Sequence, residues 1–567
     1  MLPLLAQLVA PPLQNSPIRL PGPEAGETRP QPGQPTPPVP VEIEPGTGTS
    51  EPPPGEVPPS QPQSPPQGEP TPLPSIQGET PFSPVELQRI LGTCAQQPDR
   101  AAALNACAAA LSARLVADGY VNSRVYVRDT PAPGGLEVVE GRVVELRVTG
   151  KDERLNRRVA RLLRPLQGSV LHVPSVEREL QLLKRLPGVS AVRGNLSRLG
   201  SDPSQAVFTV SVEPGAQRWQ GEFSARNDGT NGSGDARLLG TLVKGDLATR
   251  GDTLLLYGEL DGETDGSLGA VITSLSYTLP LADQWNFTGA FGYSRRNLIE
   301  LPSPSDGIST VQYQGLGQLE RVFHETLSQR WSFFAGFSGN RSNTYLDGRA
   351  LPDLVPESVR SPSSGYVRLG LSANGFADRV GWGGNVYLLQ GISAVTPEAQ
   401  RKELAVADIV PGKATALGAI ASTAWAFAPS WQLNLRAAGQ VAFRPLTSPM
   451  QFTLGSDVGL RGLPGQLISG DSGWLGTAEV SWSFWQNGSN TFQIVPFFGV
   501  GGVQTNLAGV SFSDTVGSGG LLARWLNGNH WLVELGWVEQ FQVDDNPGPW
   551  TDWVLGKGFY AQLKYRF

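Results

Sequence analysis

The sequence ends with "FYAQLKYRF", residues 559–567, in which apolar and polar side chains alternate up to the final residue. Successive side chains of a β-strand point to opposite faces, so this segment is predicted to be a strand with two unlike faces. One face carries Phe559, Ala561, Leu563, Tyr565 and Phe567, and the other carries Tyr560, Gln562, Lys564 and Arg566. The predicted strand is therefore apolar on one side, polar on the other, and aromatic at its last position.

The same two-residue alternation runs through residues 214–567. Clear examples are "WNFTGAFGY" (285–293), "YVRLGLSA" (366–373), "WQLNLRAAGQ" (431–440) and "WLVELGW" (531–537). A soluble β-sandwich also alternates, but here aromatic residues recur at the ends of the apolar faces while arginine, glutamine and asparagine occupy the polar faces. Aromatic girdles and a polar lumen are typical of a membrane β-barrel, and a segment of this length holds roughly 16 strands.

No stretch of the sequence reaches the roughly 20 consecutive apolar residues that a membrane-spanning helix needs. A membrane protein without such helices must form a closed barrel, because lipid offers no hydrogen-bond partner to an unpaired strand edge. We therefore predict a transmembrane antiparallel β-barrel over residues 214–567, with the C-terminal strand pairing with the first one.

The N-terminal residues have a different composition. "MLPLLAQLVA" (1–10) is apolar and ends on alanine but lacks a basic start, so it fits either a secretory signal peptide or a disordered tail. We expect a signal peptide within residues 1–20. Residues 21–70 are rich in proline and should form an extended, disordered linker, with a proline-rich docking segment as the alternative.

Two small α+β modules are predicted between the linker and the barrel, at residues 71–150 and 151–213. In the first, Ser83, Pro84 and Glu86 form a capping-box start for a helix, and a second helix begins at Asp99. The predicted order is β-α-α-β-β, and the second module repeats it. Cys94 and Cys107 lie in these two helices, so we expect either a disulfide, which an oxidising compartment would favour, or two free buried thiols.

Several functional classes lack their sequence signatures. The three histidines are far from one another and from both cysteines, so no metal site is expected. No phosphate-binding loop, dinucleotide fingerprint or nucleophile elbow is present, and we expect neither a cofactor nor enzymatic activity. The net charge of -7 and the lack of a long basic run argue against nucleic acid.

The chain resembles the two-partner secretion translocators (TpsB, the haemolysin-activator ShlB/FhaC/HecB type) of the POTRA-plus-barrel outer-membrane superfamily. "IQGETPFSPVELQRIL" (76–91), "LVADGYVNSRVYV" (115–127) and "LEVVEGRVVELRVTG" (136–150) resemble a first POTRA module. The segment "GSDVGLRGLPGQLISGDSGWLGTAEVSW" (455–482) resembles the sixth-loop segment of the superfamily. Its tip, Leu460, Arg461, Gly462 and Leu463, stands where the superfamily has VRGF or VRGY.

One position departs from the family pattern. The family pairs the loop arginine with an aspartate in an FxDxG strand motif, and the matching "FFGVG" (497–501) has Gly499 at the aspartate position. Arg461 must therefore find another acid or stay solvated.

The resemblance implies an outer-membrane channel that exports a large, unfolded, filamentous and repeat-rich partner protein from the periplasm to the cell surface. The POTRA modules would lie in the periplasm and receive the partner by strand addition, for which we name the edge Val207, Phe208, Val210 and Val212. Phe559, Leu563, Tyr565 and Phe567 would form the C-terminal signal read by the barrel assembly machinery. The barrel would contact outer-membrane lipid and work as a monomer. The alternative functions are a barrel insertase, a passive porin and a membrane-embedded enzyme.

Overall fold

The computed structural model describes residues 41–43, 73–95, 99–130, 132, 134–184, 186, 188–215, 219–229, 232–249, 251–282, 284–299, 307–506, 512–542 and 558–567. These residues form two compact units, one within residues 36–216 and one from residue 217 to the C-terminus. The expected signal peptide and, apart from 41–43, the expected linker lie outside the described residues. Among the described helices, none is both long and apolar enough to cross a membrane.

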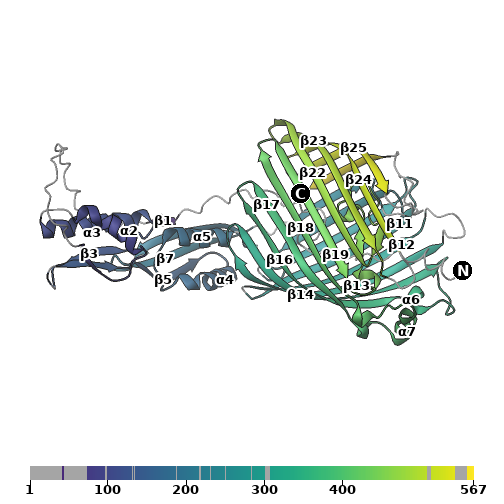
Figure 1. Cartoon of the computed structure of the whole chain (residues 1–567), viewed down its shortest axis with the longest axis horizontal. Coiled ribbons are helices and arrows are strands. Elements are labelled where there is room, and N and C mark those ends of the chain that lie inside the picture. Colours follow the sequence, from purple (N-terminus) through teal and green to yellow (C-terminus); the bar gives the residue numbers. More distant parts are fainter. Residues whose placement is uncertain are drawn as a thin grey trace. The chain divides into compact units, whose positions relative to one another are not determined.

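The C-terminal unit is a closed antiparallel barrel of 16 long strands, as predicted, with one short extra strand (Figure 1). The strands are β8 (Trp219–Arg226), β9 (Ala236–Gly245), β10 (Thr253–Gly262), β11 (Leu268–Ala282), β12 (Trp285–Asn297), β13 (Ile308–Glu325), β14 (Gln329–Leu346), β16 (Ser363–Ala377), β17 (Val380–Gly391), β18 (Thr415–Ala428), β19 (Trp431–Ala442), β22 (Ser472–Asn487), β23 (Asn490–Gln504), β24 (Ser513–Asn527), β25 (Trp531–Gln542) and β26 (Phe559–Arg566). The loops carry β15 (Arg349–Ala350), α6 (Glu357–Arg360), η2 (Ser393–Val395), α7 (Glu398–Val406) and η3 (Pro411–Lys413).

The last strand closes the barrel, as the sequence predicted. β26 pairs with β8 from Gln562 opposite Arg226 to Arg566 opposite Glu222. The backbone of Phe567 continues this seam, because its N–H donates to the Gly221 carbonyl at 3.0 Å and its carbonyl accepts from the Gly221 N–H at 3.1 Å. The chain is therefore hydrogen-bonded across the seam up to its last residue, and no strand edge is left open there.

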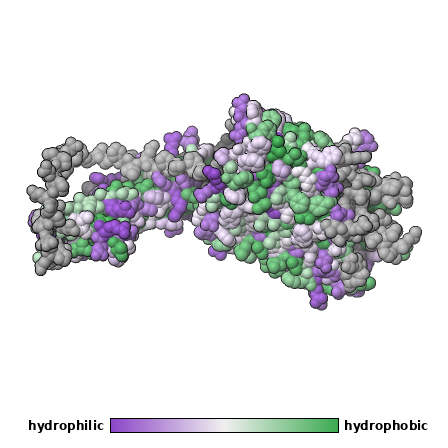
Figure 2. Space-filling view, turned by 45° about the horizontal axis from the view of Figure 1, so that its top comes forward, coloured by the Kyte–Doolittle hydropathy of each residue, from purple (hydrophilic) through white to green (hydrophobic). Residues whose placement is uncertain are grey.

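The barrel wall is apolar outside and polar inside. Leu238 is 55% exposed, whereas its neighbour Arg237 is 1% exposed, and Leu535 is 46% exposed beside Glu534 at 1%. Hydrophobic side chains cover much of the barrel surface in view in Figure 2. A soluble protein buries its apolar side chains and exposes its polar ones, so this wall has the opposite distribution. It suits a barrel with lipid outside and a polar lumen.

Aromatic rings form a girdle at the barrel end that has the short turns. The rings in contact are Trp425, Phe427, Trp431, Trp482, Phe484 and Phe492, followed on the next strands by Trp525, and near the seam by Trp531, Tyr565, Phe567 and Phe223. Phe567 stacks on Phe223 of the first strand with ring centroids 5.9 Å apart. The terminal aromatic residue thus completes the girdle across the seam. Aromatic girdles of this kind lie at the membrane–water interface.

The other unit contains two modules, each with the order β-α-α-β-β. The first comprises β2 (Ser75–Gln77), α2 (Pro84–Cys94), α3 (Arg100–Ala117), β3 (Arg124–Arg128) and β4 (Gly135–Val139). The second comprises β5 (Arg142–Thr149), α4 (Glu153–Leu163) with η1 (Arg164–Leu166), α5 (Val173–Lys184), β6 (Val189–Arg198) and β7 (Gln205–Pro214). The predicted capping box is present at α2, and hydrogen bonds from Ser83 hold the pKa of the Glu86 carboxyl below its usual value.

The expected module boundary at residue 150 is corrected by β5. The sequence predicts one strand of the first module over 136–150, because valine and leucine recur through this segment. In the structure, β4 joins the first sheet, while β5 pairs in parallel with β7 of the second. The chain crosses between the modules at Gly141, where a Cβ atom would lie 2.0 Å from the side chain of Asn122. Only glycine fits this crossing, so the second module begins at about β5.

The expected substrate edge at Val207, Phe208, Val210 and Val212 is also corrected. These residues lie on β7, which is the middle strand between β6 and β5 and is hydrogen-bonded on both sides. Their side chains are buried. Such a strand has no free backbone ladder for an incoming segment. On its other side β6 pairs in parallel with the short β1 (Val41–Ile43), with Val41 opposite Gly194, so the edges of this sheet are β1 and β5.

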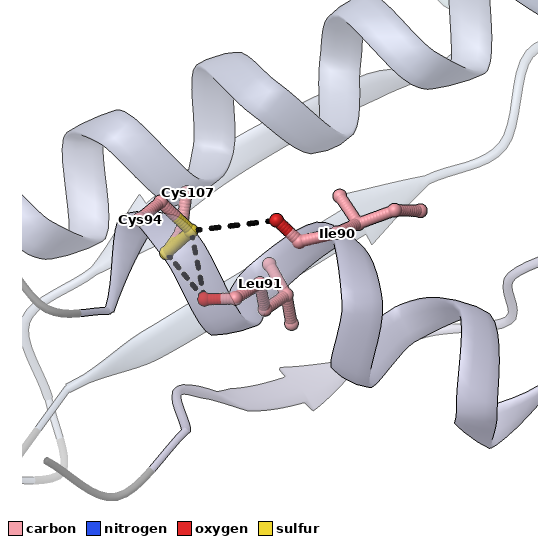
Figure 3. The surroundings of a disulfide bond; sticks show 4 residues. All are labelled: Ile90, Leu91, Cys94 and Cys107. Carbon is pink, nitrogen blue, oxygen red and sulfur yellow. Dashed lines mark hydrogen bonds between the residues drawn. A yellow bond between two sulfur atoms is a disulfide. The ribbon is translucent and has the colours of Figure 1, made fainter. Parts of the chain in front are cut away.

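Cys94 and Cys107 form a disulfide between the end of α2 and the middle of α3, with Cα atoms 5.1 Å apart (Figure 3). Both sulfur atoms lie beside the Leu91 carbonyl oxygen, in the core of the first module. A short crosslink of this kind ties the two helices together against the sheet.

The seam gives a prediction about Gly221. A Cβ at this position would lie 2.4 Å from Cζ of the Phe567 ring, so Gly221→Ala must displace the terminal ring from the girdle. Overpacking of this kind costs about 1–3 kcal/mol. We expect a smaller fraction of folded, heat-modifiable barrel on unheated gels. Gly258→Ala on β10 is the matched control, because a Cβ there meets nothing within 4 Å. Equal folded fractions for the two variants would contradict this role of Phe567.

Candidate functional site: the loop between β19 and β22

The loop with the superfamily-like segment folds as a hairpin inside the barrel wall. After η4 (Ser448–Met450), β20 (Phe452–Leu454) pairs with β21 (Ile468–Gly470), and η5 (Ser456–Val458) leads into the tip. The tip is closed by its own backbone, since the Ser456 N–H donates to the Pro464 carbonyl at 3.0 Å and the Asp457 N–H to the Gly465 carbonyl at 3.1 Å. The hairpin therefore presents the 457–463 side chains from a stiff frame.

Three glycines of the barrel wall make room for the apolar side chains of the hairpin. A Cβ on Gly473 would lie 2.3 Å from the Phe452 ring, one on Gly501 would lie 2.7 Å from Leu454, and one on Gly499 would lie 2.8 Å from Leu460. These apolar residues form one buried cluster with Leu463 and Leu467. The hairpin is therefore packed directly on the backbone of β22 and β23, a close approach that glycine permits because it has no side chain.

This packing explains the departure at Gly499. The position that carries an aspartate in the family pattern is here covered by the Leu460 side chain, which is fully buried. A carboxylate at 499 would meet a methyl group of Leu460 instead of a solvated space. Leu463, which stands at the aromatic position of the family motif, is likewise buried in the same apolar cluster.

Arg461 finds two other acids. Its guanidinium pairs with Glu534 of β25 at 2.5 Å and with Glu479 of β22 at 3.3 Å. Arg524 of β24 pairs with the same two carboxylates, at 2.6 Å to Glu534 and 2.8 Å to Glu479. We call these four residues the Arg461 cluster. The sequence left Arg461 either paired with another acid or solvated, and in the structure it is paired.

The charges of the Arg461 cluster alternate around a ring. Arg524 and Glu534 are almost fully buried, and each carboxylate forms an ion pair with both guanidinium groups. Buried charges persist only when paired and hydrogen-bonded, and arginine is suited to bridging two carboxylates. The arrangement can hold the loop tip against three strands, and it offers no nucleophile with an adjacent base.

The structure brings together only some of the predicted site residues. Leu460, Arg461, Leu463 and Gly499 meet at one place, whereas the C-terminal aromatic residues lie on the outer face and the cysteines lie in the other unit. The sequence reasoning missed Glu479, Arg524 and Glu534. Glu534 lies on the polar face of the alternating segment "WLVELGW", so the sequence predicts that its side chain points into the lumen. The sequence does not predict that it pairs with Arg461.

The Arg461 cluster predicts unequal effects of two substitutions. Glu534→Ala leaves two buried arginines sharing one carboxylate, and breaking a buried pair in this way costs about 3–5 kcal/mol. Arg461→Ala leaves Glu479 and Glu534 sharing Arg524, but the removed Arg461 side chain is 18% exposed whereas that of Glu534 is 1% exposed, so water can compensate more of this loss and its cost should be smaller. We expect Glu534→Ala to lower the temperature at which the folded gel band is lost by more than Arg461→Ala does. A larger temperature decrease in Arg461→Ala than in Glu534→Ala would contradict this account of the Arg461 cluster.

Comparison with known proteins identifies the family of this chain. The family described as "Haemolysin secretion/activation protein ShlB/FhaC/HecB" matches residues 206–519. The chain is 24% identical over 384 residues to an outer membrane transporter CdiB of Dickeya dadantii (strain 3937), with 65% of this chain and 64% of that protein covered. It is 23% identical over 432 residues to an outer membrane transporter CdiB of Escherichia coli, with 72% and 68% covered. The match to the Dickeya protein thus spans less than two thirds of that relative's length.

Solved structures share the fold. CdiB from Escherichia coli superposes with a TM-score of 0.62 at 18% identity, covering 90% of this chain and 93% of that one. CdiB from Acinetobacter baumannii gives 0.57 at 14%, with 100% and 96% covered. BamA from Haemophilus ducreyi lacking POTRA domains 1-3 gives 0.52 at 13%, with 87% and 99% covered. Because the family match covers more than half of the 567 residues, this chain belongs to the haemolysin secretion/activation (ShlB/FhaC/HecB) family.

Proposed function

We propose that this chain exports a large, unfolded partner protein through its barrel, from the periplasm to the cell surface. The observation that carries the proposal is the Arg461 cluster inside a closed barrel with a polar interior. A hairpin held to the wall by charges and by apolar contacts on glycine keeps a defined position in a lumen. An extended chain in transit would pass a polar wall that makes no strong apolar contacts with it.

We place reception of the partner on the two modules, on the periplasmic side. Strand addition needs an edge whose backbone groups can pair with an extended segment. With β7 excluded, the strand that fits is β6, which becomes an edge when the short segment Val41–Ile43 leaves it. The incoming partner would take the place of that segment. Backbone pairing tolerates many sequences, which suits a long, repetitive partner.

The outer surface of the barrel suggests two further partners, outer-membrane lipid and the barrel assembly machinery. The apolar belt of the barrel would contact outer-membrane lipid, and the two-sided strand β26 would be read by the barrel assembly machinery during insertion. A closed barrel with no open edge among its described strands suits a channel that works as a monomer.

Capture of the partner tests this proposal against the insertase alternative. Residues 71–213, which lack Val41–Ile43 and so leave β6 free, would be immobilised and exposed to periplasmic extract of the source organism. We expect one large, repeat-rich secreted protein, identified by mass spectrometry. A collection of barrel precursors that share an aromatic C-terminus would favour the insertase and contradict export.

The captured partner then allows a test of the hairpin. Arg461→Ala releases the tip from Glu479 and Glu534, and we expect at least about tenfold less partner in the medium, since charge-assisted contacts are each worth more than 1.4 kcal/mol. The folded barrel band should persist. Arg368→Ala is the matched control, because Arg368 lies on β16 and its described ring contacts are with Phe334 and Tyr387 of the wall. Unchanged export by Arg461→Ala would overturn the role of the hairpin.

A further inference from the structure

The seam between β26 and β8 is a weak place in the barrel wall. Its strand pairs run from Gln562 to Arg566, continued at the end by the bonds between Phe567 and Gly221, and they are fewer than those between β25 and β26 or between β8 and β9. Side chains add to it, because Asn227 bonds to the backbone of Phe559 and Ala561 and Lys564 pairs with Glu222. A short ladder opens more readily than its neighbours unless something else holds the flanking strands together.

The loop tip contacts the wall on both sides of this seam. On one side Arg461 pairs with Glu534, and Gln540 donates to the Gly462 carbonyl at 2.9 Å, both from β25. On the other side Asp457 pairs with Arg237 of β9 at 2.6 Å. The two seam strands lie between β25 and β9 in the barrel order. Residues 457–462 therefore span the seam from inside.

A backbone bond strengthens the second attachment. The Gly465 N–H donates to the Gly229 carbonyl at 2.9 Å, directly after β8. Gln466 donates to the Asp457 carboxylate at 3.2 Å and so orients it toward Arg237. The tip is thus attached to the β8–β9 side by one ion pair and one backbone bond.

The wall charges on the two sides are already paired without the loop. Arg237 pairs with Glu259 at 2.7 Å and lies 3.7 Å from Asp261, both on β10. Arg524 likewise pairs with Glu479 and Glu534. Asp457 is therefore not needed to neutralise Arg237, and Arg461 is not the only cation of its cluster. Undocking the tip would therefore strand neither arginine of the wall, and it would leave Glu479 and Glu534 sharing Arg524.

We propose that the loop tip is a two-point brace across the β26–β8 seam, in which Asp457 and Arg237 are positioning residues that form the second anchor. The opposite charges of Asp457 and Arg461 direct the two ends of the tip to opposite sides of the seam. The brace keeps the seam closed while the tip is docked, and undocking of the tip would loosen the seam first. This inference concerns the barrel alone and holds for any exported partner.

Hydrogen exchange of the purified, lipid-embedded full chain tests the brace without a partner protein. Asp457→Asn keeps the size of the side chain and an oxygen for Gln466 but removes the charge that meets Arg237. We expect amide exchange in residues 219–226 and 559–566 to become at least about tenfold faster, because a local opening rate follows the free energy of that opening. Exchange in the β16–β17 hairpin should not change. Asp457→Glu should restore most of the protection.

Asp514→Asn is the matched control. Asp514 is also a buried acid of the barrel and accepts from Gln542 at 2.8 Å, but it belongs to β24 and its described bond does not reach the loop tip. The Asp514→Asn substitution should leave amide exchange in residues 219–226 and 559–566 unchanged. Seam exchange in Asp457→Asn that equals the parent protein would overturn the brace. Equal acceleration in all strands would also overturn it, because that result means a general loss of barrel stability.

Discussion

A barrel in lipid must pair every backbone group of its wall, and this constraint governs the rest of the structure. It requires the last strand to meet the first, and β26 does so with β8. The pairing reaches the final residue, where Phe567 bonds to Gly221 and stacks on Phe223. The alternation of the C-terminal strand therefore serves both sides of the wall. Its aromatic face completes the girdle, and its polar face carries Gln562 and Lys564 into the interior.

Closure also turns the polar faces of 16 strands toward one another, which concentrates charge in the lumen. The wall accommodates these charges by pairing them between neighbouring strands, as in Arg237 with Glu259 and Arg524 with Glu534. The loop hairpin uses both kinds of wall surface. Its leucines lie over wall glycines, and its two charged residues extend existing ion pairs. The hairpin of this chain is thus held by both kinds of contact, and its undocking would leave Glu479 and Glu534 sharing Arg524.

Much of this fold was predictable from local pattern. Period-two alternation gave the barrel, its closure and the inward direction of Glu534, and the capping box gave the start of α2. The errors arose where pattern does not determine pairing. Valine and leucine recur on both sides of Gly141, so β5 was placed in the wrong module, and β7 was taken for an edge although parallel pairing with β5 makes it central. The acids that meet Arg461 depend on the register of β22, β24 and β25 and on the fold of the loop, which no single segment encodes.

The central claim is that the partner protein passes through the barrel lumen. Asn434 and Leu435 are neighbours on β19, with the first on the polar face and the second 42% exposed on the apolar face. A photoreactive amino acid at each position, with export stalled by a folded domain fused to the partner, would report where the chain travels. Passage through the lumen predicts crosslinks to the partner from position 434 and none from position 435. Crosslinks from 435 alone, or equal yields from both, would contradict transport through the lumen.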